Sequence, residues 1–212
     1  MVELVIKSTL ETLIMCSGAM VFGFVFGIPL AVLLIITQAG GLKQHPVLNF
    51  VLSALVNALR SIPYIIMMIL LLPLTRILVG SSIGTMAALV PLSLAAVLLV
   101  AREAQSSMQE VDVGLIEAGK AMGATSAMII RKVLLGESWP ATMSGITTVA
   151  INIIGYSAMA GAVGGGGLGD LAIRYGYQRY DLQLLAVIII ILIVMVQIVQ
   201  MLGDYWVRAL KK

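Results

Sequence analysis

Three glycines in the second half of the chain have the spacing of a known phosphate-binding motif. Gly164, Gly166 and Gly169 match GxGxxG, which in dinucleotide-binding proteins lets the backbone approach a pyrophosphate. The motif has this meaning only between a strand and a helix of a βαβ unit, whereas here it follows a long uncharged segment, and no Gly-Lys-Ser or Gly-Lys-Thr follows it. We therefore expect no nucleotide binding by this chain and interpret the glycines as a flexible cap to the preceding helix.

No other group of side chains has the composition of a catalytic or metal site. His45 is the only histidine and stands beside Pro46, without a cysteine or carboxylate cluster. Cys16 is the only cysteine, so no disulfide can form within the chain. The sequence offers neither a Ser/His/Asp set nor a carboxylate pair, which argues against an intramembrane enzyme.

Polar residues interrupt an otherwise aliphatic run in the second half of the expected helix 139–162. They are Asn152, Tyr156 and Ser157, accompanied by Met159. Asn152 and Tyr156 are four residues apart and so share one face of a helix. Polar groups inside a membrane usually face protein or water. Lining a solute pathway and ordinary packing between helices are both compatible with this pattern.

A second interruption is the sequence Arg60-Ser61-Ile62-Pro63. Proline removes a backbone hydrogen bond and kinks a helix, and an arginine near the bilayer centre costs at least about 2.5–3.5 kcal/mol on insertion scales. Such a residue usually faces the protein interior. A buried structural partner and a place in the pathway remain equally open for Arg60.

The elements that carry these residues follow from composition. Sixty per cent of the 212 residues are hydrophobic and 11% are charged, with a mean hydropathy of +1.09. Soluble domains carry roughly 25% charged residues, so this chain must have lipid as its solvent. Uncharged stretches of about 20 residues can cross the hydrocarbon core. We expect an all-α membrane protein and a single domain, 1–212, with five spanning helices at about 8–37, 46–74, 83–101, 139–162 and 182–210.

Lysine and arginine residues predict the orientation of these spans. With five spans, one side carries Lys43, Arg102, Lys120, Arg131, Lys132, Arg208, Lys211 and Lys212. The other side carries Lys7, Arg76, Arg174 and Arg179. The more basic side is usually cytoplasmic, which places the N-terminus outside and the C-terminus inside. No basic run or aromatic platform indicates a nucleic-acid partner.

The segment 106–137 is long for a cytoplasmic loop of such a compact chain. Asp112 can cap a helix from 113 to 122, which Gly123 would end. Thr125 or Ser126 can cap a second short helix from 127 to 135. This pattern predicts two short helices at the membrane face, joined by a glycine turn, which could insert into a groove on a soluble partner.

The same segment resembles the EAA loop of binding-protein-dependent ABC importers. The matching residues are Glu117-Ala118-Gly119, then Gly123, then Val133-Leu134-Leu135. The sequence departs from the family pattern in having Gly119 as the third residue of the motif and Gly136 where a proline closes the loop. The resemblance implies that Glu117, Ala118 and Gly119 dock on an ATP-hydrolysing subunit and that Gly123 makes the turn.

Resemblance to methionine importer permeases extends over nearly the whole chain, through the residues 60–63, the run 155–164 and the layout of five spans. It implies the type I ABC importer permease fold, with two copies of this chain, two copies of an ATPase and a periplasmic substrate-binding lipoprotein in an inner membrane. ATP and magnesium would belong to the ATPase, and this chain would carry no cofactor. By resemblance, Met159 is a gate residue; Arg60, Pro63, Asn152, Tyr156 and Ser157 are the other candidates for the pathway.

Three functions are compatible with this sequence. The favoured one is the membrane subunit of an ATP-driven importer for methionine, in its L- and D-forms. A permease for another amino acid or small polar solute is the alternative within the same class. A stand-alone secondary transporter is disfavoured, because such proteins usually contain repeated halves and several intramembrane ionisable residues.

Overall fold

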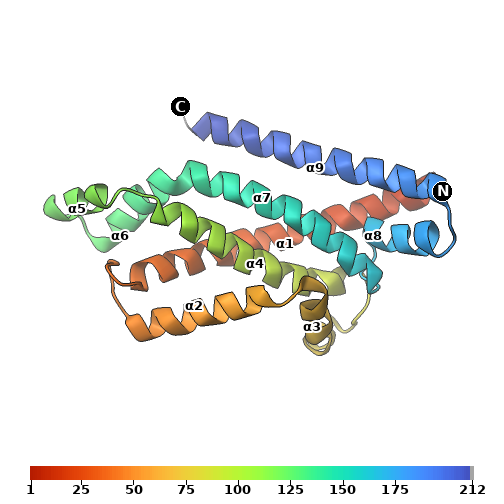
Figure 1. Cartoon of the computed structure of the whole chain (residues 1–212), viewed down its shortest axis with the longest axis horizontal. Coiled ribbons are helices and arrows are strands. Elements are labelled where there is room, and N and C mark those ends of the chain that lie inside the picture. Colours follow the sequence, from red (N-terminus) through yellow and green to blue (C-terminus); the bar gives the residue numbers. More distant parts are fainter. Residues whose placement is uncertain (211–212) are drawn as a thin grey trace.

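The computed structural model describes residues 1–210, and every regular element in that range is helical (Figure 1). Lys211 and Lys212, both counted above for the orientation, lie outside the described residues. In chain order the elements are α1 Val2–Thr37, α2 Pro46–Ser61, α3 Tyr64–Val79, α4 Thr85–Gln109, α5 Val113–Ala121, α6 Ser126–Met128, the π-helical η1 Ile129–Leu134, α7 Leu135–Ala162, α8 Gly167–Leu171, the π-helical η2 Ala172–Tyr177 and α9 Leu182–Leu210.

The long helices run roughly along one axis (Figure 1). The helix α4 packs against both α1 and α7, and α9 packs against α7. At one end of the molecule lie α5 and α6, and at the other lie α8 and the N-terminus. These two ends are called the α5 end and the α8 end below.

Four continuous helical segments are long and apolar enough to cross a membrane: α1, α4, Ser126–Ala162 and α9. The expected span 46–74 differs, because it consists of two helices, α2 and α3, whose directions differ by 108°. Pro63 lacks an N–H group and forces Ile62 out of the helical region, to φ −79° and ψ 124°. The prediction of one kinked helix was therefore wrong, and the pair makes a fifth span only if both halves are counted as one.

Other helix limits also differ from those expected. The helix α1 begins at Val2, six residues before the expected start, and α4 continues to Gln109. The second short helix predicted at 127–135 is not separate, since α6, η1 and α7 form one continuous helix from Ser126 to Ala162. The predicted hairpin at the α5 end is thus one short helix packed on the start of a long one.

Glycines set the close contact between α1 and α4. Gly23 and Gly27 have the GxxxG spacing and are both buried. A β-carbon on Gly23 would lie 3.0 Å from the Ala96 β-carbon, and one on Gly27 would lie 2.9 Å from the Val100 β-carbon. Small residues at this spacing let two helix backbones approach. The spacing therefore serves packing within the chain.

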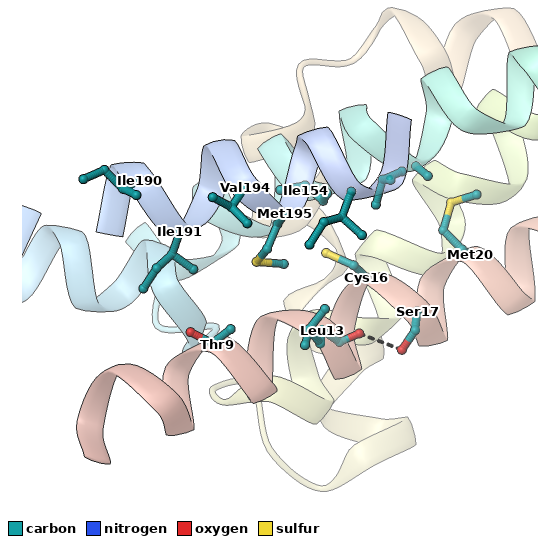
Figure 2. Close-up of a pocket in the computed structure, with 13 residues that line it drawn as sticks. Thr9, Leu13, Cys16, Ser17, Met20, Ile154, Ile190, Ile191, Val194 and Met195 are labelled. Carbon is teal, nitrogen blue, oxygen red and sulfur yellow. Dashed lines mark hydrogen bonds between the residues drawn. The ribbon is translucent and has the colours of Figure 1, made fainter. Parts of the chain in front are cut away.

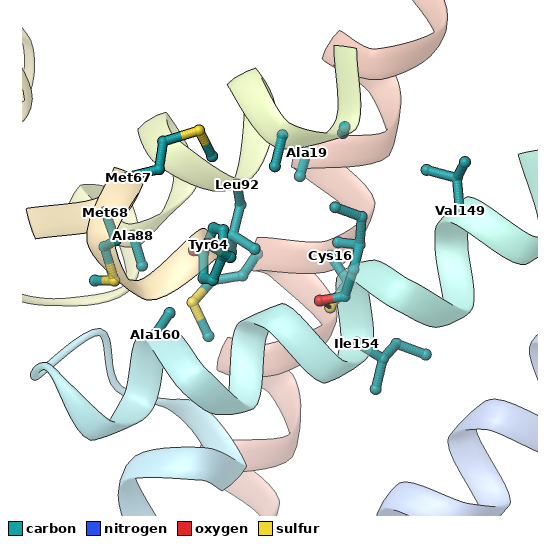
Figure 3. Packing of buried hydrophobic residues seen from close by; sticks show 14 of the residues in the cluster. Cys16, Ala19, Tyr64, Met67, Met68, Ala88, Leu92, Val149, Ile154 and Ala160 are labelled. Atoms are coloured by element: carbon teal, nitrogen blue, oxygen red, sulfur yellow. Dashed lines mark hydrogen bonds between the residues drawn. The ribbon is translucent and has the colours of Figure 1, made fainter. Parts of the chain in front are cut away.

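The largest apolar cluster lies where α1, α3, α4 and α7 meet (Figure 3). Met15 and Ala19 of α1, Leu92 of α4 and Ile153 of α7 are each inaccessible to solvent. Tyr64, the first residue of α3, is 6% exposed. The broken helix is therefore anchored in the centre of the molecule by its first residue.

The glycine-rich segment 164–169 does not form the flexible cap that was expected. Gly164, Gly166 and Gly167 have φ between +75° and +85°, which only glycine adopts readily. The chain then forms a helix, α8 followed by η2, whose residues Leu168 and Leu171 are fully buried. The glycines therefore make a tight turn into a packed helix.

Candidate functional site

One face of α7 carries small and polar residues and is not covered by the rest of the described chain. Its exposed residues recur every three or four positions: Ala141, Ser144, Thr148, Asn152, Gly155, Met159 and Ala162. An amide and two hydroxyl groups on a membrane helix are usually directed at protein or water. The face therefore suits a contact with another polypeptide or with an aqueous path.

The half of this face nearest the α5 end borders an open cavity of about 670 Å³. Ser144 and Thr148 line it from α7, and Glu103, Glu110 and Glu137 bring three carboxylates to its walls. The cavity is thus polar and acidic.

A different hollow runs between α1, α7 and α9 (Figure 2). It has a volume of about 520 Å³ and is lined mainly by aliphatic side chains, among them Leu13, Ile190 and Val194. The Cys16 thiol lies beside it and donates a hydrogen bond to the Ile153 carbonyl oxygen, 3.9 Å away. With no charged side chain in its lining, this groove suits hydrocarbon rather than a charged solute.

The structure separates the four residues that the sequence grouped on this helix. Asn152 and Met159 lie on the exposed face, and Met159 is 48% exposed. Ser157 is 2% exposed and its hydroxyl donates to the Ile154 carbonyl oxygen at 2.7 Å, so it faces the core. Tyr156 is half-buried between these two faces.

Tyr156 connects the exposed face of α7 with the break between α2 and α3. Its ring stacks on that of Tyr64, with the ring centroids 4.6 Å apart and an angle of 3° between the planes. Both residues are among those that line a small cavity of about 40 Å³, together with Arg60. Arg60 is exposed and makes no ion pair or side-chain hydrogen bond within residues 1–210. Pro63, the residue before α3, supplies no side-chain cap.

The helix α5 presents the expected docking residues at the end of the molecule (Figure 1). Glu117 and Ala118 are exposed, whereas Gly119 is buried, with the position of its absent β-carbon 3.5 Å from the Ile129 Cγ1 atom. The predicted cap is confirmed, because the Asp112 carboxylate accepts a hydrogen bond from the Gly114 N–H at 2.7 Å. Gly123 has φ +75° and turns the chain after α5, as predicted.

Tyr64 and Glu11 were missed by the sequence reasoning. Tyr64 follows the Arg60–Pro63 motif directly, but an aromatic residue in an apolar run gave no signal. The Glu11 carboxylate accepts from the Gly167 N–H, and the Thr12 hydroxyl accepts from the Leu168 N–H, both at 2.9 Å. The one sign in the sequence that Glu11 could cap another helix was its position as a carboxylate at the edge of an uncharged run.

Comparisons with known proteins agree over almost the whole chain. The family model described as binding-protein-dependent transport system inner membrane component matches residues 23–212. The chain is 48% identical over 208 residues to the probable D-methionine transport system permease protein MetI of Vibrio cholerae, covering 98% of this chain and 92% of the relative. It is 44% identical over 180 residues to the methionine import system permease protein MetP of Bacillus subtilis, covering 85% and 81%.

Solved structures give the same result. A chain from a crystal form of the MetNI methionine ABC transporter, described as inward facing, superposes with a TM-score of 0.97. The sequence identity is 42%, and the match covers 100% of this chain and 98% of the other.

Proposed function

This chain belongs to the binding-protein-dependent transport system inner membrane components, and on that premise we propose that it forms the translocation pathway of an ATP-driven methionine importer. It has the type I ABC importer permease fold. The chain is a transport subunit and not an enzyme, since hydrolysis of ATP belongs to a separate subunit. The substrate is methionine in its L- and D-forms.

The polar face of α7 is the observation that carries this proposal. A helix with exposed Ser144, Thr148 and Asn152 cannot present that face to lipid without a penalty. Two copies of the chain that turn these faces toward each other enclose a path lined by polar groups. The acidic cavity near the α5 end forms the inner mouth of that path.

Transmission of motion depends on the α5 end. Glu117 and Ala118 lie exposed on a short helix, whose buried Gly119 packs next to Ile129. Because Ile129 belongs to the continuous helix Ser126–Ala162, a force on α5 reaches the pathway helix directly. Two copies of an ATPase, each docked on one α5, alternate between two states and shift the pathway between outward and inward access.

The positions of the partners follow from this arrangement. The α5 end faces the cytoplasm together with the C-terminus, and the α8 end with the N-terminus faces outward, in a bacterial inner membrane. A periplasmic substrate-binding lipoprotein delivers methionine at the α8 end. Arg60, Pro63, Asn152, Tyr156 and Met159 belong to the pathway or its gate, whereas Ser157 supports it from the core side of α7.

The decisive experiment is reconstitution of the purified complex with its ATPase and binding protein in liposomes. We expect uptake of L-methionine that requires ATP, and a mass that corresponds to two copies of each chain. Glu117→Lys should abolish both ATPase attachment and uptake, because it reverses a charge at the docking surface. Glu3→Lys, an equal change on an exposed residue of the opposite end, is the matched control.

Two results would contradict this function. Uptake by the chain alone in ATP-free liposomes would favour the secondary transporter. ATP-dependent uptake of another amino acid, not inhibited by methionine, would favour the alternative permease.

A further inference from the structure

The break between α2 and α3 leaves backbone donors without partners. The first N–H groups of a helix have no acceptor within that helix. At the start of α3, Pro63 offers no side chain that could cap them. The N–H groups of Tyr64 and Ile65 form no hydrogen bond within residues 1–210. The helix is 16 residues long, so its N-terminus also carries the partial positive charge of the helix dipole.

Tyr64, the first residue of α3, carries a further hydrogen-bond donor without a partner. The residue is 6% exposed, yet its hydroxyl group has no hydrogen-bond partner among the described residues. A buried hydroxyl without a partner is unfavourable, and the exceptions in folded proteins call for an explanation. Stacking on Tyr156 fixes the ring, so the side chain does not turn away to reach water. Tyr64 is one of the residues that line the small cavity next to the helix break.

Arg60 adds a full positive charge to the same cavity. It lies in the last turn of α2 and lines the cavity together with Tyr64 and Tyr156. No carboxylate of the described chain pairs with it, since the one ion pair there joins Arg174 to Asp170. Guanidinium groups in membrane proteins are usually paired, and they bind carboxylates through two parallel hydrogen bonds.

From these three observations we propose that Arg60, Tyr64 and the N-terminus of α3 form a subsite for the α-carboxylate of the transported amino acid. Half-helix N-termini of discontinuous membrane helices commonly face anionic substrate groups. The cavity, at about 40 Å³, admits a group the size of a carboxylate but not a whole amino acid. The substrate side chain therefore extends from the subsite toward the exposed face of α7, beyond Tyr156. The proposal rests on the importer function and assigns to it the group that recognises the substrate's charge.

Uptake by the reconstituted complete transporter tests the subsite. Tyr64→Phe removes one hydroxyl and keeps the stacked ring, and Arg60→Gln removes the charge. Loss of a hydrogen bond to a charged group predicts a decrease in uptake of roughly 10- to 100-fold. Stimulation of ATP hydrolysis by the loaded binding protein should remain, because neither residue lies at the docking loop. Tyr177→Phe and Arg76→Gln, both on exposed residues, are the matched controls and should transport normally.

Thermal unfolding of the detergent-purified complex gives an independent readout. We expect L-methionine and L-norleucine, which both carry an α-carboxylate, to raise the unfolding midpoint, and L-methioninamide to leave it unchanged. In Tyr64→Phe and Arg60→Gln this difference should disappear. Equal protection by methionine in the wild type and both variants would place any binding elsewhere and overturn the subsite. Equal protection by inorganic phosphate through Arg60 and Tyr64 would make the cavity a general anion site, which also overturns it.

Uptake measurements distinguish the importer function from the carboxylate subsite. Absence of ATP-dependent methionine uptake by the wild-type transporter contradicts the importer function itself. Normal uptake by the wild type and by both variants contradicts the carboxylate subsite alone.

Discussion

The Glu11 carboxylate on α1 accepts a hydrogen bond from the Gly167 N–H at 2.9 Å, although the two residues are 156 positions apart. The next residue of α1, Thr12, accepts from the Leu168 N–H in the same way. These two side chains cap the helix formed by α8 and η2, which no residue of its own caps. Gly166 must be a glycine here, because a β-carbon would lie 3.1 Å from the Glu11 Oε2 atom and its φ is +77°.

Glu11→Ala should lower the thermal midpoint of the purified complex by several degrees, whereas Glu11→Gln should lower it less. A hydrogen bond to a charged group contributes about 1.5–3 kcal/mol, and glutamine keeps an acceptor. Glu3→Ala, on an exposed residue of the same helix, serves as the control. Equal midpoints for Glu11→Ala and the control would show that the cap does not contribute to stability.

Two glycines in spanning helices should respond oppositely to leucine. Gly23→Leu should reduce the amount of folded protein, since its β-carbon would lie 3.2 Å from the Ala96 carbonyl oxygen, and overpacking typically costs about 1–3 kcal/mol. Gly155→Leu should leave the chain folded, because nothing lies within 4 Å of its β-carbon position, but it should block methionine uptake. Size-exclusion profiles and uptake assays measure both effects. Normal uptake by Gly155→Leu would argue against the pathway on this face of α7.

Gly123→Ala should weaken coupling between ATP hydrolysis and transport. The residue has φ +75°, a left-handed conformation that costs an alanine roughly 1–2 kcal/mol. Gly123→Asn should perform better, because asparagine adopts this region more readily. Gly136→Ala, whose β-carbon would lie 4.0 Å from its nearest neighbour, is the control. The measurement is the ratio of methionine uptake to ATP hydrolysed, and an unchanged ratio for Gly123→Ala would contradict a coupling role for this turn.

Cysteine labelling can compare the two faces of α7. In a Cys16→Ala background, Asn152→Cys should react with a charged methanethiosulfonate reagent, because Asn152 is exposed on the face that we assign to the aqueous path. Ser157→Cys should stay unmodified, since Ser157 is 2% exposed and packed in the core. Equal labelling of the two positions would be inconsistent with the proposed orientation of α7.

Helix content and the position of the loop at the α5 end were predictable from the sequence. The uncharged runs gave the spanning helices, because length and hydropathy alone decide whether a helix can cross a bilayer. Asp112 and Gly123 gave both ends of α5, since capping and left-handed turns depend on local chemistry. The expected range 182–210 agrees with α9 for the same reason.

The directions of the helices and the contacts between them could not be predicted from the sequence. Pro63 indicated a kink, but the 108° change of direction depends on how Tyr64 packs beneath α7, which no local rule contains. Ser157 and Asn152 are both small polar residues, so the sequence did not distinguish them. The packing of α7 against α1 and α4 buries Ser157 and leaves Asn152 exposed.

For this protein, then, the sequence by itself determined that lipid is the solvent, where the apolar segments lie and how the two ends of α5 are capped and turned, because these properties depend on composition and on residues within one or two turns. The tertiary structure decided which polar groups meet. Glu11 reaches Gly167, and Tyr156 joins the neighbouring residues Arg60 and Tyr64 at one cavity, only because helices distant in sequence pack side by side.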